Sequence, residues 1–186
     1  MESLRQFFQL LRISQWSKSS FVLLGVIYSG ASLYWPNALL AAFAFCLSSS
    51  AVYIYNDLID READRLHIYK SLRPLARNEV SLNFAIYLAI VLSIASLSLA
   101  LLISKQLLIL LASYLFINLL YNHGIKNLPG LDVLCIASGF MLRVLAGTVG
   151  IGLPFSWWLI ISQPRLRRIY FTGAISASFP KLAAIW

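Results

Sequence analysis

The sequence predicts an all-α protein built as a multi-pass transmembrane helical bundle. Hydrophobic residues make up 60% of the 186 residues and charged residues only 12%, whereas soluble globular proteins average about 45–50% and about 25%. Mean hydropathy is +0.77. The apolar residues gather in runs of the length that a helix needs to cross a bilayer, which is about 20 residues. We therefore expect about five membrane spans and a partial sixth.

The expected spans follow one another along the chain as five apolar runs. The first and fourth runs are short for a span, and Ser, Asn and Tyr flank both. A sixth run at 157–162 is ended by Pro164 and three arginines, so it is too brief to cross a bilayer. The five runs lie at 21–35, 38–55, 84–103, 107–121 and 131–151.

The segment before the first run predicts a short interfacial helix. Arg5 and Arg12 lie on either side of several large apolar residues. In a cleavable signal peptide, by contrast, the positive charges come first and an uninterrupted apolar core follows them. An amphipathic helix lying on the membrane surface fits this pattern better.

The basic residues of the chain predict its orientation in the membrane. Fifteen Lys and Arg oppose seven Asp and Glu, which gives a net charge of +8. Nearly all of the basic residues outside the last segment lie before the first run, between the second and third, or between the fourth and fifth, whereas the opposite loops hold only Lys105. Because cytoplasmic loops carry an excess of Lys and Arg, we expect a plasma (inner) membrane protein with a cytoplasmic N-terminus. No aromatic-basic recognition module occurs, so we expect no nucleic-acid partner.

A polar segment at the cytoplasmic end of the second run predicts a metal site. On a helix, Asn56, Asp57, Asp60 and Asp64 fall within an arc of about 100°. Clustered carboxylates repel one another unless a cation lies among them, and such oxygen ligands suit Mg²⁺, which bridges protein carboxylates to substrate phosphates. The segment therefore predicts a magnesium–pyrophosphate site. A solvated acidic helix end with basic partners nearby is the alternative.

Arg143 predicts a second polar site, inside the fifth run. An arginine in the middle of a span costs about 2.5–3.5 kcal/mol on insertion scales and by default marks an anionic partner. Asp132 lies eleven positions earlier on nearly the same side of the helix, at about 16 Å, which is too far for a direct ion pair. A phosphate, or a residue of another helix, is the better candidate, and an internal ion pair is the alternative.

Taken together, these residues resemble a known family. The segment 56–64, followed by His67, Lys70, Arg73 and Pro74, is similar to the first aspartate-rich motif of UbiA-type intramembrane prenyltransferases. Three further segments, 15–18, 121–132 and 138–147, resemble its decaprenyl-phosphate phosphoribosyltransferase branch, and the resemblance covers about residues 10–162. It implies a UbiA-like bundle that transfers phosphoribosyl from phosphoribosyl diphosphate to a polyprenyl phosphate, with Mg²⁺ as cofactor and pyrophosphate as the leaving group.

The residues then take expected roles in that reaction. Magnesium held by the carboxylates would neutralise the charge that develops on pyrophosphate, and basic side chains would bind the remaining phosphate oxygens. We expect catalytic roles for Asp57, Asp60 and Asp64, metal binding by Asn56, Asp57, Asp60 and Asp64, phosphate binding by Lys18, Lys70, Arg73, Lys126 and Arg143, and substrate orientation by Tyr121, Asn122 and Asp132.

Two other functions stay open at this point. The first motif is shared by UbiA-type enzymes that move a prenyl group from prenyl diphosphate to an aromatic or other acceptor. The chain is alternatively a non-catalytic membrane fragment or partner that still binds magnesium and pyrophosphate.

The end of the sequence departs from the family pattern. UbiA-type enzymes have about nine membrane helices and a second acidic motif, whereas residues 163–186 contain no Asp or Glu. We expect residues 1–162 to be the N-terminal part of a UbiA-like membrane domain and 163–186 to be an atypical basic tail. We expect a remnant of a longer enzyme with little or no activity of its own, and a genuine short protein with a basic ending is the alternative.

Overall fold

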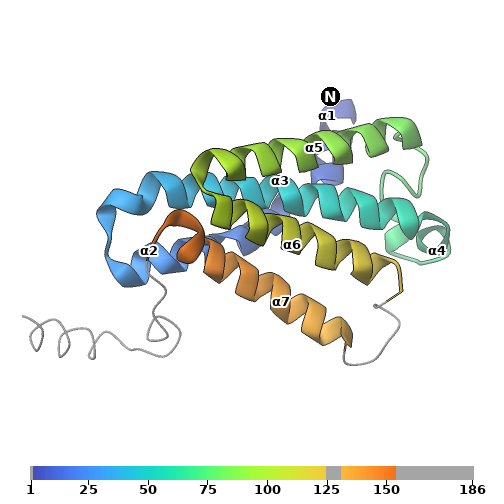
Figure 1. Ribbon diagram of the computed structural model, residues 1–186. Coiled ribbons are helices and arrows are strands. Elements are labelled where there is room, and N and C mark those ends of the chain that lie inside the picture. Colours follow the sequence, from blue (N-terminus) through green and yellow to red (C-terminus); the bar gives the residue numbers. More distant parts are fainter. Residues whose placement is uncertain (1, 125–130, 154–186) are drawn as a thin grey trace, which may run out of the picture. The chain divides into compact units, whose positions relative to one another are not determined.

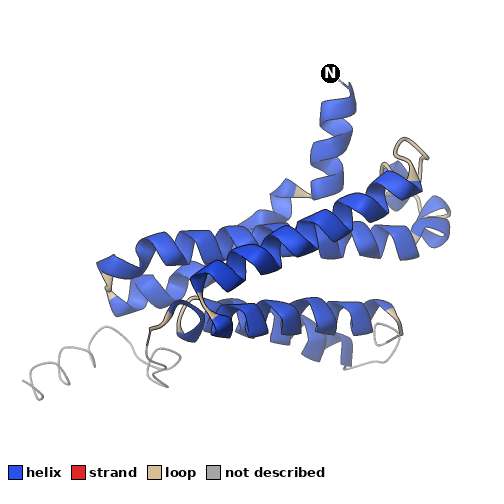
Figure 2. Ribbon diagram, turned by 45° about the horizontal axis from the view of Figure 1, so that its top comes forward, coloured by secondary structure: helices blue, strands red, loops and turns tan. Residues whose placement is uncertain are grey.

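Helix α3 is the element against which most of the others pack. In the computed structural model, which describes residues 2–124 and 131–153, α3 covers Trp35–Ile59. It contacts α5 (Leu82–Ile103), α6 (Lys105–Asn122), α1 (Glu2–Leu11) and the 3-10 helix η1 (Ile13–Leu23). From α5 onward, each long helix packs on the next, ending with α7 (Leu131–Ala146) (Figure 1). The described residues contain helices and loops but no strand (Figure 2), so the all-α prediction is confirmed.

Four described helical segments are long and apolar enough to cross a membrane. They coincide with the second to fifth apolar runs of the sequence, and the multi-pass helical architecture is thereby confirmed. Half of the most apolar window of the first segment is buried within the protein, compared with 17% for the second. The expected sixth run and the basic tail lie outside the described residues. The four segments are Ser32–Ile59, Leu82–Ile103, Lys105–Asn122 and Val133–Ile151.

The first predicted span, at 21–35, differs from the expectation of one continuous helix. The chain instead forms η1, then the six-residue helix α2 (Leu24–Ser29), and then a 3-10 turn at Ser32–Tyr34. Two serine hydroxyls of η1 donate to carbonyls three residues earlier, Ser17 to Ser14 at 3.2 Å and Ser20 to Ser17 at 2.7 Å. Such bonds compete with the regular helical pattern. Gly30 then ends α2 in a left-handed conformation, with φ of 62°.

Serine caps set the start of α5 and of α6. The Ser81 hydroxyl accepts a hydrogen bond from the Phe84 amide at 3.3 Å, and Ser104 does the same for Leu107 at 2.9 Å. The Ser104 hydroxyl also donates to the carbonyl of Gly150 at 2.5 Å. The turn between α5 and α6 is therefore tied to the segment that follows α7.

Two glycines let the end of α7 lie directly against the N-terminal segment. A Cβ atom at Gly147 would stand 1.6 Å from the carbonyl oxygen of Val22, and one at Gly25 would stand 1.9 Å from the carbonyl oxygen of Gly147. Any larger side chain would push the two backbones apart. The Gly147 amide also donates to the carbonyl of Arg143 at 3.1 Å. The close approach of the two backbones therefore lies within one helical turn of Arg143 and helps to fix the position of that residue.

The close approach at Gly147 yields a stability prediction. Substitution Gly147→Ala is expected to destabilise the fold by about 1–3 kcal/mol, because overpacking of a tight contact typically costs that much. The measurement is the thermal unfolding midpoint in detergent micelles. Gly139→Ala, within α7, is the control, since its Cβ would meet no atom closer than 3.5 Å. Equal midpoints for the two variants would contradict the role given to Gly147.

Candidate active site

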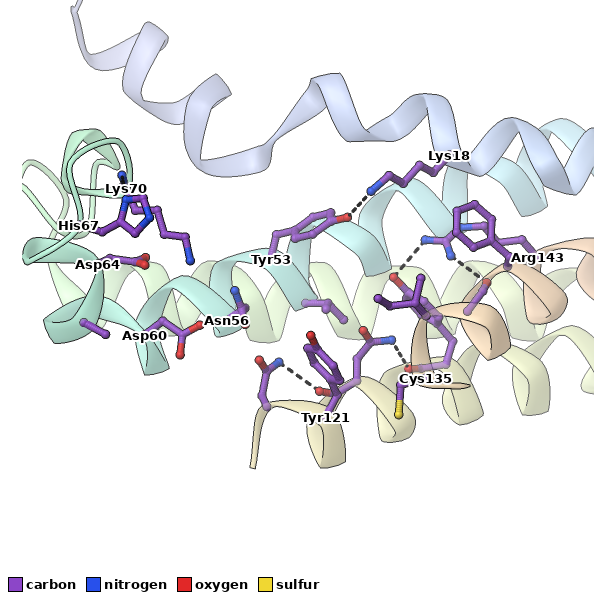
Figure 3. Close-up of a pocket in the computed structure, with 18 residues that line it drawn as sticks. Lys18, Tyr53, Asn56, Asp60, Asp64, His67, Lys70, Tyr121, Cys135 and Arg143 are labelled. Atoms are coloured by element: carbon purple, nitrogen blue, oxygen red, sulfur yellow. Dashed lines mark hydrogen bonds between the residues drawn. The ribbon is translucent and has the colours of Figure 1, made fainter. Parts of the chain in front are cut away.

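A cavity of about 700 Å³ opens among α3, η1, α6, α7 and the segment that follows α3. Several residues that lie far apart in the sequence meet on its walls (Figure 3). Eight of the residues predicted for the site line this one cavity: Lys18, Asn56, Asp60, Asp64, Lys70, Tyr121, Asn122 and Arg143.

The acidic end of the cavity is built where α3 gives way to the short helix α4 (Arg61–Arg65). The Asp60 amide donates to the carbonyl of Asn56 at 2.9 Å, and the Asp64 amide donates to the carbonyl of Asp60 at 2.8 Å. These bonds continue the helical i→i−4 pattern across the junction. Asn56, Asp60 and Asp64 therefore stay on the same side and face the cavity together.

Asp57 does not line the cavity, in contrast to the expectation that all four polar residues of this segment share it. The Asp57 carboxylate is 4% exposed, and its Oδ1 accepts hydrogen bonds from Arg12 Nη2 at 2.5 Å and Arg73 Nη1 at 3.0 Å. The same Arg73 nitrogen also donates to Asp64 Oδ2 at 2.5 Å. Asp57 lies about 100° around the helix from Asn56, at the edge of the arc that the four residues share, where the two arginines hold its carboxylate. Arg73 is also absent from the cavity lining.

Arg143 forms the other end of the cavity. Its side chain is 5% exposed, and Nη2 donates to the Ser49 hydroxyl at 2.9 Å and the Tyr114 hydroxyl at 3.0 Å. Nη1 donates to the carbonyl of Gly139 at 2.8 Å, and the guanidinium carbon lies 4.7 Å from the centre of the Tyr114 ring. The buried Nε has no hydrogen-bond partner, and no carboxylate of the described residues forms an ion pair with Arg143. Among the described residues, neutral groups alone hold this positive charge in place.

The two ends of the cavity are separated along the direction of α3. Figure 3 shows Asn56, Asp60 and Asp64 toward one end and Arg143 with Lys18 toward the other, with Tyr53 between them. Ser49, which holds Arg143, precedes Asn56 by seven positions and Asp60 by eleven, so the ends are about 10–16 Å apart along α3. The Lys18 ammonium lies 3.3 Å from the Tyr53 hydroxyl. A ligand with anionic groups at both ends would match this separation.

The cavity also contains residues that the sequence did not single out. Tyr114 and Asn118 lie on α6 with Tyr121 and Asn122, at a spacing that places all four on one face of that helix. The side-chain Nδ2 of Asn118 donates to the backbone carbonyl of Tyr114 at 2.8 Å, and Nδ2 of Asn122 donates to the backbone carbonyl of Asn118 at 3.0 Å. The sequence contains a signal for this wall of the cavity, because polar residues recur at helical spacing within an apolar span.

Three further residues of the predicted motifs remain to be placed: His67, Lys126 and Asp132. His67, part of the family motif, lines the cavity, and its Nδ1 accepts a hydrogen bond from the Tyr69 amide at 3.2 Å. Lys126 and the side chain of Asp132 lie outside the described part of the chain.

The donors at the acidic end suit a magnesium ion that arrives with its substrate. The described residues contain no cluster of three or more His, Cys, Asp or Glu that would enclose a metal. Mg²⁺, however, is usually bound through one or two carboxylates plus substrate phosphates and keeps several waters. The carboxylates of Asp60 and Asp64 and the amide oxygen of Asn56 are donors of that kind, and they line a cavity with room for a diphosphate.

Comparisons with known proteins give consistent results. The sequence pattern of the UbiA prenyltransferase family matches residues 19–163. A Mycolicibacterium smegmatis protein named decaprenyl-phosphate phosphoribosyltransferase is 35% identical over 158 residues, which cover 81% of this chain and 50% of that protein. The chain spans about half the length of the curated relatives it matches.

Solved structures agree with the sequence comparisons. A structure reported with mechanistic insights into digeranylgeranylglyceryl phosphate synthase in membranes matches with a TM-score of 0.77 and 26% identity, covering 87% of this chain and 57% of that one. A UbiA homologue from Archaeoglobus fulgidus bound to DMAPP and Mg²⁺ matches with a TM-score of 0.70 and 25% identity, covering 82% of this chain and 56% of that one.

Proposed function

The chain belongs to the UbiA prenyltransferase family, and from that membership we propose that it carries the donor site for phosphoribosyl transfer from phosphoribosyl diphosphate to a polyprenyl phosphate. The names of the most similar curated relatives support this choice of donor and acceptor. UbiA-family proteins are transferases, and a structural neighbour holds both a prenyl diphosphate and Mg²⁺.

The observation that carries the proposal is the presence of a buried cation at the end of the cavity opposite the carboxylates. Arg143 is 5% exposed, and its Nε has no hydrogen-bond partner among the described residues. A buried guanidinium without a carboxylate favours a bound anion, because its charge is otherwise poorly compensated. Phosphoribosyl diphosphate has a diphosphate at one end and a 5-phosphate at the other, whereas a prenyl diphosphate is anionic at one end only. The two-ended cavity therefore favours the sugar phosphate donor.

The residues of the acidic end would hold the diphosphate. Asn56, Asp60 and Asp64 would bind Mg²⁺ together with the diphosphate oxygens, and bound magnesium would stabilise the charge of the leaving pyrophosphate. Lys70 would bind a further phosphate oxygen as a point charge. Tyr121 and Asn122, on the wall between the two ends, would hydrogen-bond the ribose hydroxyls and orient the anomeric carbon.

The reaction itself needs little proton transfer. An oxygen of the polyprenyl phosphate attacks the anomeric carbon, the bond from that carbon to the pyrophosphate oxygen breaks, and pyrophosphate leaves. The acceptor phosphate is already ionised at neutral pH, so no general base is required. Lys18, beside Tyr53 near the Arg143 end, would contact the acceptor phosphate. The lipid tail would extend into the bilayer, and the excess of basic loops would keep this end of the bundle cytoplasmic.

A second candidate is transfer of a prenyl group from prenyl diphosphate to another acceptor. The structural neighbour bound to DMAPP and Mg²⁺ favours it. The acidic end would serve that donor equally well, since both donors carry a diphosphate. The two reactions differ in their need for Arg143, which a prenyl donor leaves without an anionic partner.

Removal of a carboxylate from the acidic end tests the metal site. Asp60→Asn and Asp64→Asn are each expected to weaken binding of magnesium pyrophosphate by about 10–100-fold, which is the usual loss when groups around a metal are removed. Isothermal titration of the detergent-purified chain measures this affinity. Glu62→Gln is the control, because Glu62 lies on the same short helix, is 74% exposed and is absent from the cavity lining. Equal affinities for all three variants would exclude a metal site at these residues.

Substitution of Arg143 by lysine tests the choice of donor. Lysine keeps the charge but cannot reach the Gly139 carbonyl, Ser49 and Tyr114 together, because it lacks the planar fork of arginine. Arg143→Lys is expected to weaken binding of phosphoribosyl diphosphate about tenfold or more, and to leave the affinity for dimethylallyl diphosphate within about twofold. Transfer of radiolabelled phosphoribosyl to polyprenyl phosphate measures function directly. Prenyl transfer without phosphoribosyl transfer by the wild-type chain would favour the second candidate.

A further inference from the structure

Four charged side chains form a continuous ion-pair network behind the acidic end of the cavity. Arg12 binds Asp57, Asp57 binds Arg73, and Arg73 binds Asp64, with nitrogen–oxygen distances of 2.5, 3.0 and 2.5 Å. We call these four residues the arginine–aspartate network. Only Asp64 belongs to both the network and the cavity lining.

The network joins three segments that are distant in the sequence. Arg12 lies between α1 and η1, and its backbone has a positive φ of 49°, which is uncommon for a residue other than glycine. Asp57 lies near the end of α3, and Arg73 follows the 3-10 turn at Lys70–Leu72. A single oxygen of Asp57 receives both guanidinium groups, so this carboxylate is the common anchor of the N-terminal segment and of the loop after α4.

The network is buried on its acidic side and balanced in charge. Asp57 and Asp64 are 4% and 2% exposed, and the side chains of Arg12 and Arg73 are 22% and 24% exposed. Two positive and two negative groups sum to zero. Breaking a buried pair by removing one partner leaves an uncompensated charge, so loss of Asp57 alone would leave two arginines against the single carboxylate of Asp64 within the network.

We propose that Asp57 is a positioning residue that sets Asp64 for cation binding and does not itself bind the metal. This inference rests on the proposed metal–diphosphate site. Asp57 holds Arg73 so that the guanidinium is shared between two carboxylates, which fixes the direction of the Asp64 side chain. The negative charge of Asp57 also offsets the two arginines, which would otherwise repel a divalent cation bound at Asp60 and Asp64. Outer partners of this kind orient metal ligands and tune their affinity.

A second substitution that compensates for the lost charge of Asp57 gives a specific test. Binding of Mn²⁺ alone to the full chain in lipid nanodiscs is followed by electron paramagnetic resonance for Asp57→Asn, Arg12→Gln and the double variant. We expect Asp57→Asn to weaken Mn²⁺ binding about tenfold. The double variant restores the charge balance but not the contact between Asp57 and Arg73, so it is expected to recover the affinity only in part, to within about threefold of wild type. Arg12→Gln alone is expected to leave the affinity unchanged or to raise it, and Glu62→Gln is the neutral control.

Two results would overturn the inference. If Asp57→Asn and the double variant both lose binding as completely as Asp60→Asn, then Asp57 is itself a ligand. If Asp57→Asn binds Mn²⁺ as wild type does, then Asp57 has no influence on the site, whatever its effect on stability.

A second readout separates this inference from the proposed function. Amide hydrogen exchange of α4 is expected to be faster in Asp57→Asn than in wild type, because Arg73 holds α4 through Asp64. Exchange of α6 is expected to stay the same, since no described residue of α6 forms an ion pair with the network. If the wild-type chain binds no Mn²⁺, the proposed metal site fails, and this exchange result still decides the positioning role. Unchanged exchange of α4 would refute it.

Discussion

In a bundle this apolar, a charged side chain is tolerated only where the protein itself supplies its partners, because lipid and packed side chains cannot solvate it. That constraint organises the polar interior of this protein. Arg143 is held by Ser49 from α3, by Tyr114 from α6 and by the Gly139 carbonyl of its own helix. The three hydrogen bonds fix the relative rotation of three helices and place one cation at the end of the cavity.

At the acidic end of the cavity, ion pairs supply the partners of the buried charges. Asp57 and Asp64 are buried because Arg12 and Arg73 approach them, and the two arginines bring the N-terminal segment and the loop after α4 to the end of α3. Helix α3 thus carries Ser49, Asn56 and the network anchor Asp57 along its length. The rise along this one helix sets the distance between the cationic and the acidic ends of the cavity.

Much of this arrangement could be predicted from the sequence. The apolar runs at 38–55, 84–103, 107–121 and 131–151 each became a helix, because a run of that length and composition has few other stable forms in a membrane. The spacing of Asn56, Asp60 and Asp64 placed them on one helical face, and the cavity confirms that they lie together. The first run failed as a single helix, since Gly30 ends α2 within it in a left-handed turn.

The sequence by itself determined the membrane environment and the helical class, because composition and periodicity are local properties of the chain, and its motifs indicated the family and the residue types of the candidate site. The tertiary structure alone decided how those residues share their partners. Asp57 and Asp60 belong to the same acidic motif, yet Asp57 turns toward Arg12, which precedes it by 45 positions, while Asp60 faces the cavity. Likewise, only the packing of α3, α6 and α7 could show that hydroxyl groups hold Arg143. Pairing between distant segments depends on how helices rotate against one another, and a single sequence does not record that rotation.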